Sequence, residues 1–501
     1  MEAAGLKEKA QAPSSGAANS VVQYKKRVLL PPKGEKPERP GIKGNHLERD
    51  CRRFVEKRVR FCYTVFNLWG RSVMRMKTAF VNCTLLSGTK DMEPQAGMAV
   101  VVENGKITSV EKAAGAYEGC EVVDLGGRYL MPGLINLHLH LPSTGAPKKK
   151  ETDAAKLASF LMSNPITRAL ARSVCEKAAK TELLSGVTTI RTVGGLDGVD
   201  SAIRDRIKAG KTVGPRMLVS DLAVTVPGGH MAGSVAAVAQ SEEECRALVR
   251  KIAQGKPDLI KLMITGGVLD AKVKGEPGVL RMPPELVRAA CEEAHKLGYQ
   301  VAAHVESSEG VRVALENGVD TIEHGAPLDE ALVELFKQRG AAHVCTISPA
   351  VPLAMMDPEV VGSTELTQYN GNVVFEGIVS CAKTALANDI PVGLGTDAGC
   401  PFTTHYDMWR ELQYFHKYVG VSRAFALYTA TLKNAEILGI QNETGSVEAG
   451  KSADMLITGG NPLEDLTCLR APYMVVMAGR VIAQPQVKKY PLVERELDKF
   501  L

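Results

Sequence analysis

The chain contains the run Leu134-Ile135-Asn136-Leu137-His138-Leu139-His140, directly after Pro132-Gly133. Most of its residues are apolar, as in a buried β-strand. Side chains two positions apart on a strand point to the same face, so the run predicts a strand end that presents His138 and His140 together. Two imidazoles on one face are a natural pair of metal ligands. Two histidines packed in a core or paired with carboxylates would give the same pattern.

Short apolar runs of this kind recur along the chain to about Gly439, and helix-like stretches alternate with them. The strand-like runs are Thr188–Val193, Leu259–Met263, Gln300–Ala303, Thr321–Ile322, Ala342–Cys345 and Val392–Leu394. The helix-like stretches are Ala169–Leu184, Glu242–Ile252, Pro284–Leu297, Ser308–Glu316, Glu330–Gln338 and Glu376–Ala387. Repeated βα units predict a parallel sheet, and about eight units in roughly 300 residues fit a (β/α)₈ TIM barrel.

The two ends of this region carry an all-β pattern instead. Met98–Val102 and Lys106–Val110 flank Glu103-Asn104-Gly105, and an Asn-Gly pair between apolar runs is a strong hairpin signal. Near the other end, Asp454–Thr458 and Tyr473–Ile482 are apolar, strand-like runs. We expect both ends to form one small β-sandwich domain.

Five segments follow from these patterns, in an α/β fold class. They are an N-terminal extension at 1–75, the first segment of the β-sandwich domain at 76–130, the (β/α)₈ barrel at 131–444, the second segment of the β-sandwich domain at 445–485, and a C-terminal tail at 486–501. The extension is rich in Gly, Ala, Ser and Pro and then in basic residues, which predicts disorder. A targeting or nucleic-acid arm would fit this composition, but we favour a dispensable extension, because Met76 opens a plausible domain.

The composition of the chain argues against some classes of binding partner. The net charge of +5 is small for 501 residues and much of it lies in the first eighty, which argues against nucleic acid as the main partner. Eleven cysteines without a C-x-x-C pair indicate reduced thiols. With no apolar run of about 20 residues and no signal-peptide pattern, we expect a cytoplasmic protein without a membrane partner.

Further reactive residues lie at or near the ends of the strand-like runs, where a (β/α)₈ barrel has its active site. Lys261 lies inside an apolar run, where a cation is costly to bury; it could snorkel or pair with a carboxylate, or serve as a base or a modified lysine. His304, His324 and Asp397 each follow such a run and alone could be structural. Together with His138 and His140, they indicate an active site.

Longer motifs around these residues carry a family resemblance. They are Pro132 to His140, Lys261, His304, Ile322 to Gly325, Gly395 to Asp397, Ala430-Thr431, Asn434-Ala435, Leu438-Gly439 and Gly445 to Asp454. With them the chain resembles the amidohydrolase superfamily from about Lys77 to Ile482. The resemblance implies the barrel and a β-sandwich made from both chain ends. It also implies a C–N amide hydrolase.

The resemblance implies two divalent metal ions, with zinc favoured by the N and O ligands. His138, His140 and Asp397 would hold one ion, His304 and His324 the other, and a carboxylated Lys261 would bridge them. A hydroxide between the metals would attack the amide. Asp397 would take the proton of the water and pass it to the leaving group.

Within the superfamily, the chain is most similar to imidazolonepropionase-like and Xaa-Pro dipeptidase-related hydrolases. Gly214-Pro215-Arg216 and Gly228-Gly229-His230 carry this similarity, which implies a small-molecule amide such as a dipeptide or an N-acyl amino acid. His230 would donate a hydrogen bond to the scissile carbonyl, although a loop histidine that caps the backbone fits equally well. Homo-oligomers are common among such barrels.

The chain departs from the family pattern at two positions. Asn136 stands where many relatives have aspartate, and we expect little loss from it. Glu306 stands where many have the second histidine of His-x-His; it could bind a cationic or amino-bearing substrate, or anchor a Lys or Arg. His405 and Glu411 are weak site candidates that could both be structural.

Other functions stay open. A cyclic amidase or a deaminase acting on a small heterocycle would use the same site, although Lys261 weighs against a mononuclear deaminase. A metal-binding scaffold without catalysis is the non-enzymatic alternative. We expect specificity to lie in the loops at 141–164, 224–236, 266–281 and 350–375.

Overall fold

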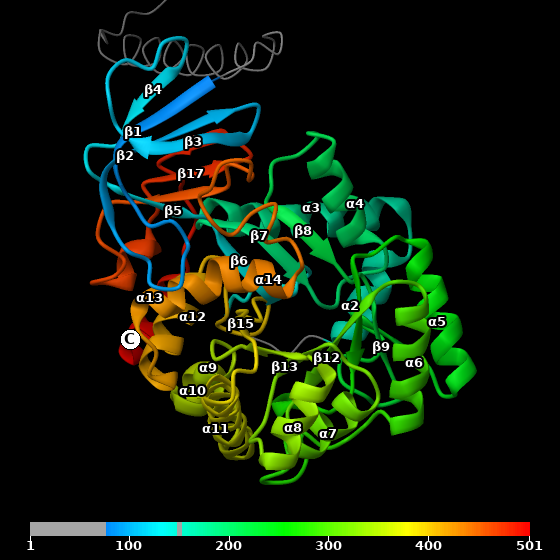
Figure 1. Ribbon diagram of the computed structural model, residues 1–501. Helices are drawn as coiled ribbons and strands as arrows, with labels where there is room; N and C mark the ends of the chain where they lie inside the picture. Colours follow the sequence, from blue (N-terminus) through cyan, green and yellow to red (C-terminus); the bar gives the residue numbers. More distant parts are fainter. Residues whose placement is uncertain (1–76, 148–152) are drawn as a thin grey trace, which may run out of the picture. The chain divides into compact units, whose positions relative to one another are not determined.

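The computed structural model describes residues 77–147 and 153–501, so the extension at 1–75 lies outside the described residues. Strands from both ends of this region pair in one eight-stranded sheet (Figure 1), in the order β18-β17-β16-β5-β1-β2-β3 with β4 beside β1. Its strands are β1 (Lys77–Leu85), β2 (Gln95–Glu103), β3 (Lys106–Lys112), β4 (Glu121–Asp124), β5 (Tyr129–Pro132), β16 (Met455–Thr458), β17 (Met474–Met477) and β18 (Arg480–Ala483). The antiparallel pairing of β5 with β16 joins the two ends.

Two parallel sheets form the middle of the chain. One has the order β6-β7-β8 and the other β10-β9-β11-β12-β13-β14-β15. The strands are β6 (Leu134–Leu139), β7 (Val187–Thr192), β8 (Arg216–Val219), β9 (Ala223–Thr225), β10 (Ala236–Val238), β11 (Leu259–Met263), β12 (Gln300–Val305), β13 (Thr321–His324), β14 (Ala342–Cys345) and β15 (Val392–Leu394). Most of their residues are buried, and half of all their residues are buried Val, Ile, Leu or Ala, as expected for parallel strands covered on both faces.

Helices alternate with these strands and make the fold α/β. They are α2 (Ala154–Met162), α3 (Pro165–Leu184), α4 (Val199–Lys208), α5 (Glu242–Gln254), α6 (Pro284–Lys296), α7 (Ser308–Glu316), α8 (Glu330–Arg339), α9 (Ala350–Met355), α10 (Pro358–Val361), α11 (Glu365–Ala387), α12 (Met408–Tyr414), α13 (Arg423–Tyr428), α14 (Asn434–Ile437) and α15 (Pro491–Leu497). Several of these helices have a side-chain cap at their N-terminus. The Ser241 side chain accepts a hydrogen bond from the Glu244 amide at the start of α5, and the Asp329 side chain accepts one from the Leu332 amide at the start of α8.

Backbone hydrogen bonds connect the two parallel sheets on both sides. The amide of Asp258 donates to the carbonyl of Val219 at 2.7 Å, and the amide of Asp397 donates to that of His138 at 2.7 Å. Gly395 permits the second contact, because a Cβ atom there would lie 2.5 Å from the His138 Cβ. The end of β15 is thereby held against β6.

The predicted helix Glu376–Ala387 is too short. Helix α11 begins at Glu365, capped by the Thr364 side chain, so together with α9 and α10 it makes most of the expected loop at 350–375 helical. Asn370 and Gly371 have low helix propensity, so the sequence pattern did not predict the first turns of α11. Tertiary packing outweighs this low propensity. The Asn370 side chain forms hydrogen bonds with the backbone of Val273 and Gly275.

The expected tail at 486–501 also differs from the prediction, because it contains helix α15. Among the described residues, no helix is long and apolar enough to cross a membrane.

Candidate active site

Two histidines and one aspartate form the first group of side chains able to hold a metal ion. The Nε2 atoms of His138 and His140, at the end of β6, lie 3.5 Å and 3.3 Å from Oδ1 of Asp397, in the turn after β15. Their potential ligand atoms all lie within 4.8 Å of one another. The structure thus brings together three residues whose joint position the sequence predicted.

A second group lies beside the first. His304, Glu306 and His324 come from the ends of β12 and β13, and their potential ligand atoms meet the same 4.8 Å limit. The ring centroids of His138 and His324 are 4.7 Å apart, so the two groups adjoin. His324 and Asp397 both adopt left-handed backbone conformations, with φ of 69° and 54°. Such strain in non-glycine residues is concentrated at functional sites.

Lys261 on β11 is fully buried, and its Nζ has no hydrogen-bond partner. It neither snorkels to the surface nor donates a hydrogen bond to a carboxylate, so the two structural explanations for this residue are wrong. Burial lowers the pKa of its amine to about 8, with nearby Glu323 opposing the shift. The uncharged form of the amine, which lysine modification requires, is therefore more populated near neutral pH than in an ordinary lysine.

Burial also favours the uncharged form of three of the site histidines. It lowers the pKa of His138 and of His304 well below the ordinary value, and that of His324 to about 3. Burial alone would raise the pKa of Asp397, but His138 and His140 outweigh it and keep that carboxyl ionised. Neutral imidazoles, a carboxylate with an unpartnered Oδ1, and an unpartnered amine are a donor set that fits divalent metal ions.

Hydrogen bonds behind the histidines orient them. His138 Nδ1 donates to Oε2 of Glu323 at 2.8 Å, and His140 Nδ1 donates to the carbonyl of Gly194 at 2.8 Å. In both rings this leaves Nε2 free on the side of Asp397. Glu323 was not among the residues expected from the sequence, although it directly precedes His324 in the Ile-Glu-His-Gly motif.

Arg191 also helps to orient His138, because it binds Glu323. The sequence pattern did not identify it. Its guanidinium binds both oxygens of Glu323 at 2.7 and 2.8 Å, and its Nε donates to the carbonyl of Leu137. Arg191 is a charged residue inside an apolar run, Thr188–Val193. A charged residue within a strand-like run was also the feature that identified Lys261 as a candidate.

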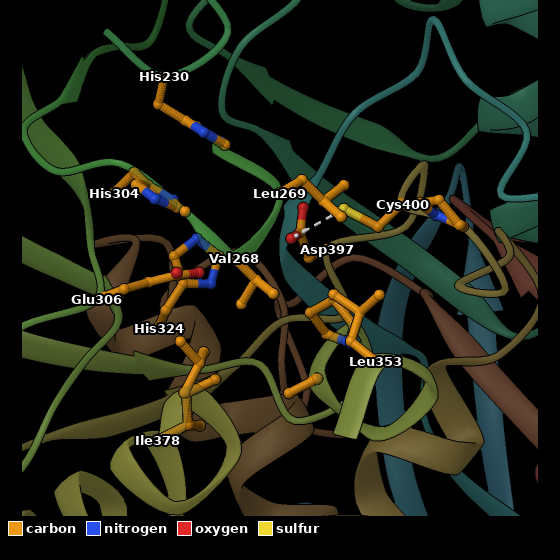
Figure 2. A pocket seen from close by; sticks show the side chains of 15 residues that line it. His230, Val268, Leu269, His304, Glu306, His324, Leu353, Ile378, Asp397 and Cys400 are labelled. Carbon is orange, nitrogen blue, oxygen red and sulfur yellow. Dashed lines mark hydrogen bonds between the residues drawn. The ribbon is translucent and has the colours of Figure 1, made fainter. Parts of the chain in front are cut away.

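His230 stacks on His304, with centroids 4.2 Å apart and planes at 9°. Its Nδ1 bonds the carboxylate of Asp270, which also accepts from the Gly267 amide at 3.1 Å. Its side chain bonds Asp270 rather than capping the backbone, and it lines a pocket with Asp397 and the second metal-capable group (Figure 2). The sequence had not pointed to Asp270, which lies in the short helix η1 (Val268–Asp270) after β11.

The pocket is lined by both polar and apolar side chains. His230, His304, Glu306, His324 and Asp397 are the polar ones, and Figure 2 shows Val268, Leu269, Leu353 and Ile378 among and around them. The cavity is small, about 80 Å³. A second cavity of about 640 Å³ shares Glu306 and Val374 with it.

The weaker candidates bond to neighbouring protein groups. His405 lies between Glu182 and the carbonyl of Ser143. Glu411 accepts hydrogen bonds from the amides of Ile347 and Ser348. Neither lines the pocket. Asn136 bonds the side chain of Thr396 at 2.8 Å and so supports the turn that carries Asp397.

The family model described as amidohydrolase family matches residues 129–482, which include both metal-capable groups. The chain belongs to the amidohydrolase family. The superfamily resemblance is thereby confirmed, and the chain is a hydrolase of C–N bonds. Amidohydrolases typically bind divalent metals, in agreement with the donor set.

Several solved and curated proteins are similar to this amidohydrolase over most of its length. A Bifidobacterium longum protein designated a prolidase is 36% identical, with a TM-score of 0.75 over 85% of this chain and 99% of that one. A Xaa-Pro dipeptidase with bound methionine is 27% identical, with a TM-score of 0.71 over 81% and 100%. Ochratoxinase of Aspergillus niger is 27% identical over 69% of this chain and 73% of its own.

Proposed function

We propose that this amidohydrolase uses two divalent metal ions to cleave the amide bond of a dipeptide or an N-acyl amino acid. The observation that carries the proposal is the convergence of His138, His140 and Asp397 with His304 and His324 beside a buried, unpartnered Lys261. Zinc suits these N and O ligands best. Relatives named prolidase and Xaa-Pro dipeptidase favour a dipeptide among the amides.

The proposal includes a fold in which the parallel strands close into a (β/α)₈ barrel and the sheet of the chain ends forms a sandwich. The hydrogen bonds from Asp258 to Val219 and from Asp397 to His138 support closure. A closed barrel brings the ends of all its strands to one face. That face would carry every residue of the proposed site.

In the proposed site, His138, His140 and Asp397 hold one ion and His304 and His324 the other, with a carboxylated Lys261 between them. When bound, the ions polarise the amide carbonyl and lower the pKa of an attacking water. Addition of CO₂ to the uncharged Lys261 amine, with release of a proton, would give an anionic carbamate, so that a potential metal ligand would replace an unpartnered amine. Arg191 and Glu323 keep His138 oriented throughout.

We assign the proton transfer to Asp397 and the hydrogen bond to the substrate carbonyl oxygen to His230. The Asp397 carboxylate takes the proton of the attacking water and delivers it to the leaving nitrogen. His230, held by Asp270 through Nδ1, directs its Nε2 edge at the scissile carbonyl oxygen, where a hydrogen bond strengthens as charge develops.

The substrate pocket favours an apolar group next to the amide. Val268, Leu353, Val374 and Ile378 line the same cavity as the imidazoles. Burial of one aliphatic side chain there is worth about 1.5–3 kcal/mol. The adjoining 640 Å³ cavity leaves room for groups larger than a dipeptide, so N-acyl amino acids belong in any substrate screen.

Elemental analysis of the purified protein tests the proposal, with wild type and Lys261→Ala compared side by side. We expect about two ions per chain in wild type and clear loss in the variant. Apolar dipeptides, N-acyl amino acids and cyclic amides are then assayed with the metal-loaded wild type. A single ion in both proteins would contradict the bridged site, and so would metal-free protein after chelator-free, metal-supplemented purification.

A further inference from the structure

Glu306 has an unusual environment for a carboxylate. It comes two positions after His304, and Figure 2 shows its side chain directed at His304 and His324. Its Oε2 is buried without a hydrogen-bond partner. Its backbone amide donates to the Thr265 hydroxyl at 3.1 Å, which holds the residue at the end of β12.

No cationic side chain compensates this carboxylate in the part of the chain that the structure describes. Glu306 takes part in none of the ion pairs there, so it anchors no Lys or Arg among the described residues. The charged neighbours Asp397 and Asp270 are both acidic. A buried carboxylate whose charged neighbours are acidic is costly to ionise unless a cation lies beside it, so this position favours a bound cation.

Two cations could meet this need, a metal ion or the amino group of a substrate. The composition of the two groups favours the metal. His138, His140 and Asp397 are two imidazoles and one carboxylate within 4.8 Å, and His304, His324 and Glu306 repeat that composition at the same spacing. Two histidines and one glutamate are also an established zinc ligand set.

We propose that Glu306 is the third protein ligand, with His304 and His324, of the second metal ion. The inference rests on the two-metal site proposed above. It assigns to Glu306 a ligand role in place of substrate binding. Each ion would then have two imidazoles and one carboxylate of its own, with Lys261 shared between them.

Titration of the metal-free, full-length protein with Co²⁺ alone tests this role, because bound Co²⁺ reports its ligands by visible absorption. In Glu306→Gln we expect one of two Co²⁺ sites to weaken tenfold or more and its spectrum to change, since even groups behind metal ligands contribute about 10–100-fold. Glu306→Asp keeps a carboxylate and should lose less. The control is Glu309→Gln, a half-exposed residue that pairs with Arg312.

Wild-type Co²⁺ affinities and spectra in folded Glu306→Gln would overturn the proposal. It would also be overturned if the variant keeps both Co²⁺ sites and raises KM only for substrates with a free amino group, relative to their N-acetylated forms. Fewer than two Co²⁺ sites in wild type would instead contradict the two-metal site itself. The two failures are therefore distinguishable. Circular dichroism of each variant establishes that it is folded.

Discussion

His138 on β6 and Glu323 on β13 are 185 positions apart in the chain and are joined by a hydrogen bond of 2.8 Å. The bond fixes which ring nitrogen of His138 faces Asp397. Arg191 on β7 holds the same carboxylate, so three strands determine the position of one imidazole. The structure therefore specifies a support for the site as well as the site itself.

Glu323→Gln should weaken metal binding about 10–100-fold, because His138 loses a charged acceptor and Arg191 loses its ion pair. The measurement is metal retention in a chelator titration. Glu293→Gln is the matched control, since Glu293 is also buried and pairs with Arg250, away from the pocket. Equal retention in the two variants would contradict the orienting role.

Asp397→Asn should lower kcat by about 10²–10⁴-fold, the usual contribution of a general acid–base group. The amide oxygen of asparagine preserves one ligand atom, so metal content should largely persist. Steady-state kinetics with elemental analysis of the same preparation checks both expectations. Turnover like that of wild type would remove the proton-transfer role from Asp397.

His230→Asn should lower kcat by about 10²–10³-fold, as loss of an oxyanion donor does. Asp270→Asn should lower it less, because Asp270 acts through His230. In the double variant, the Asp270 change should add no further loss. Exposed Glu285→Gln, which lines neither cavity, is the control. Fully additive losses would show that Asp270 acts independently of His230.

Stability should depend on Asp200, a fully buried carboxyl on α4 whose two oxygens have no hydrogen-bond partner. Burial, reinforced by the charge of Asp221, raises its pKa from 3.8 to about 7. Between these values the unfolded chain releases a proton that the folded protein keeps. Stability therefore falls as pH rises through this window, by up to roughly 4 kcal/mol at about 1.4 kcal/mol per pH unit.

Asp200→Asn removes this titration, so its Tm relative to wild type should rise between pH 5 and pH 8. Thermal unfolding at both pH values measures the difference. Exposed Asp205→Asn on the same helix is the control and should track wild type. If the Asp200→Asn and wild-type curves stay parallel, the carboxyl titrates alike in the folded and unfolded chains.

The local sequence pattern predicted the exact bounds of four elements. Strands β11, β14 and β15 and helix α7 have the predicted bounds, because apolar runs with clear ends specify buried parallel strands. The start of α11 was wrong, since Asn370 and Gly371 are stabilised by contacts with Val273, Gly275 and Leu353 that no local pattern contains.

The sequence by itself determined the α/β class, the strands that carry the reactive residues, and the identities of His138, His140, Lys261, His304, His324 and Asp397. These follow from periodicity and motif, which are properties of neighbouring residues. Only the tertiary structure decided which partners they have. Glu323 faces His138, Asp270 faces His230, and Glu306 forms no ion pair within the described ranges, because hydrogen bonds and burial depend on strands far apart in sequence meeting at one place.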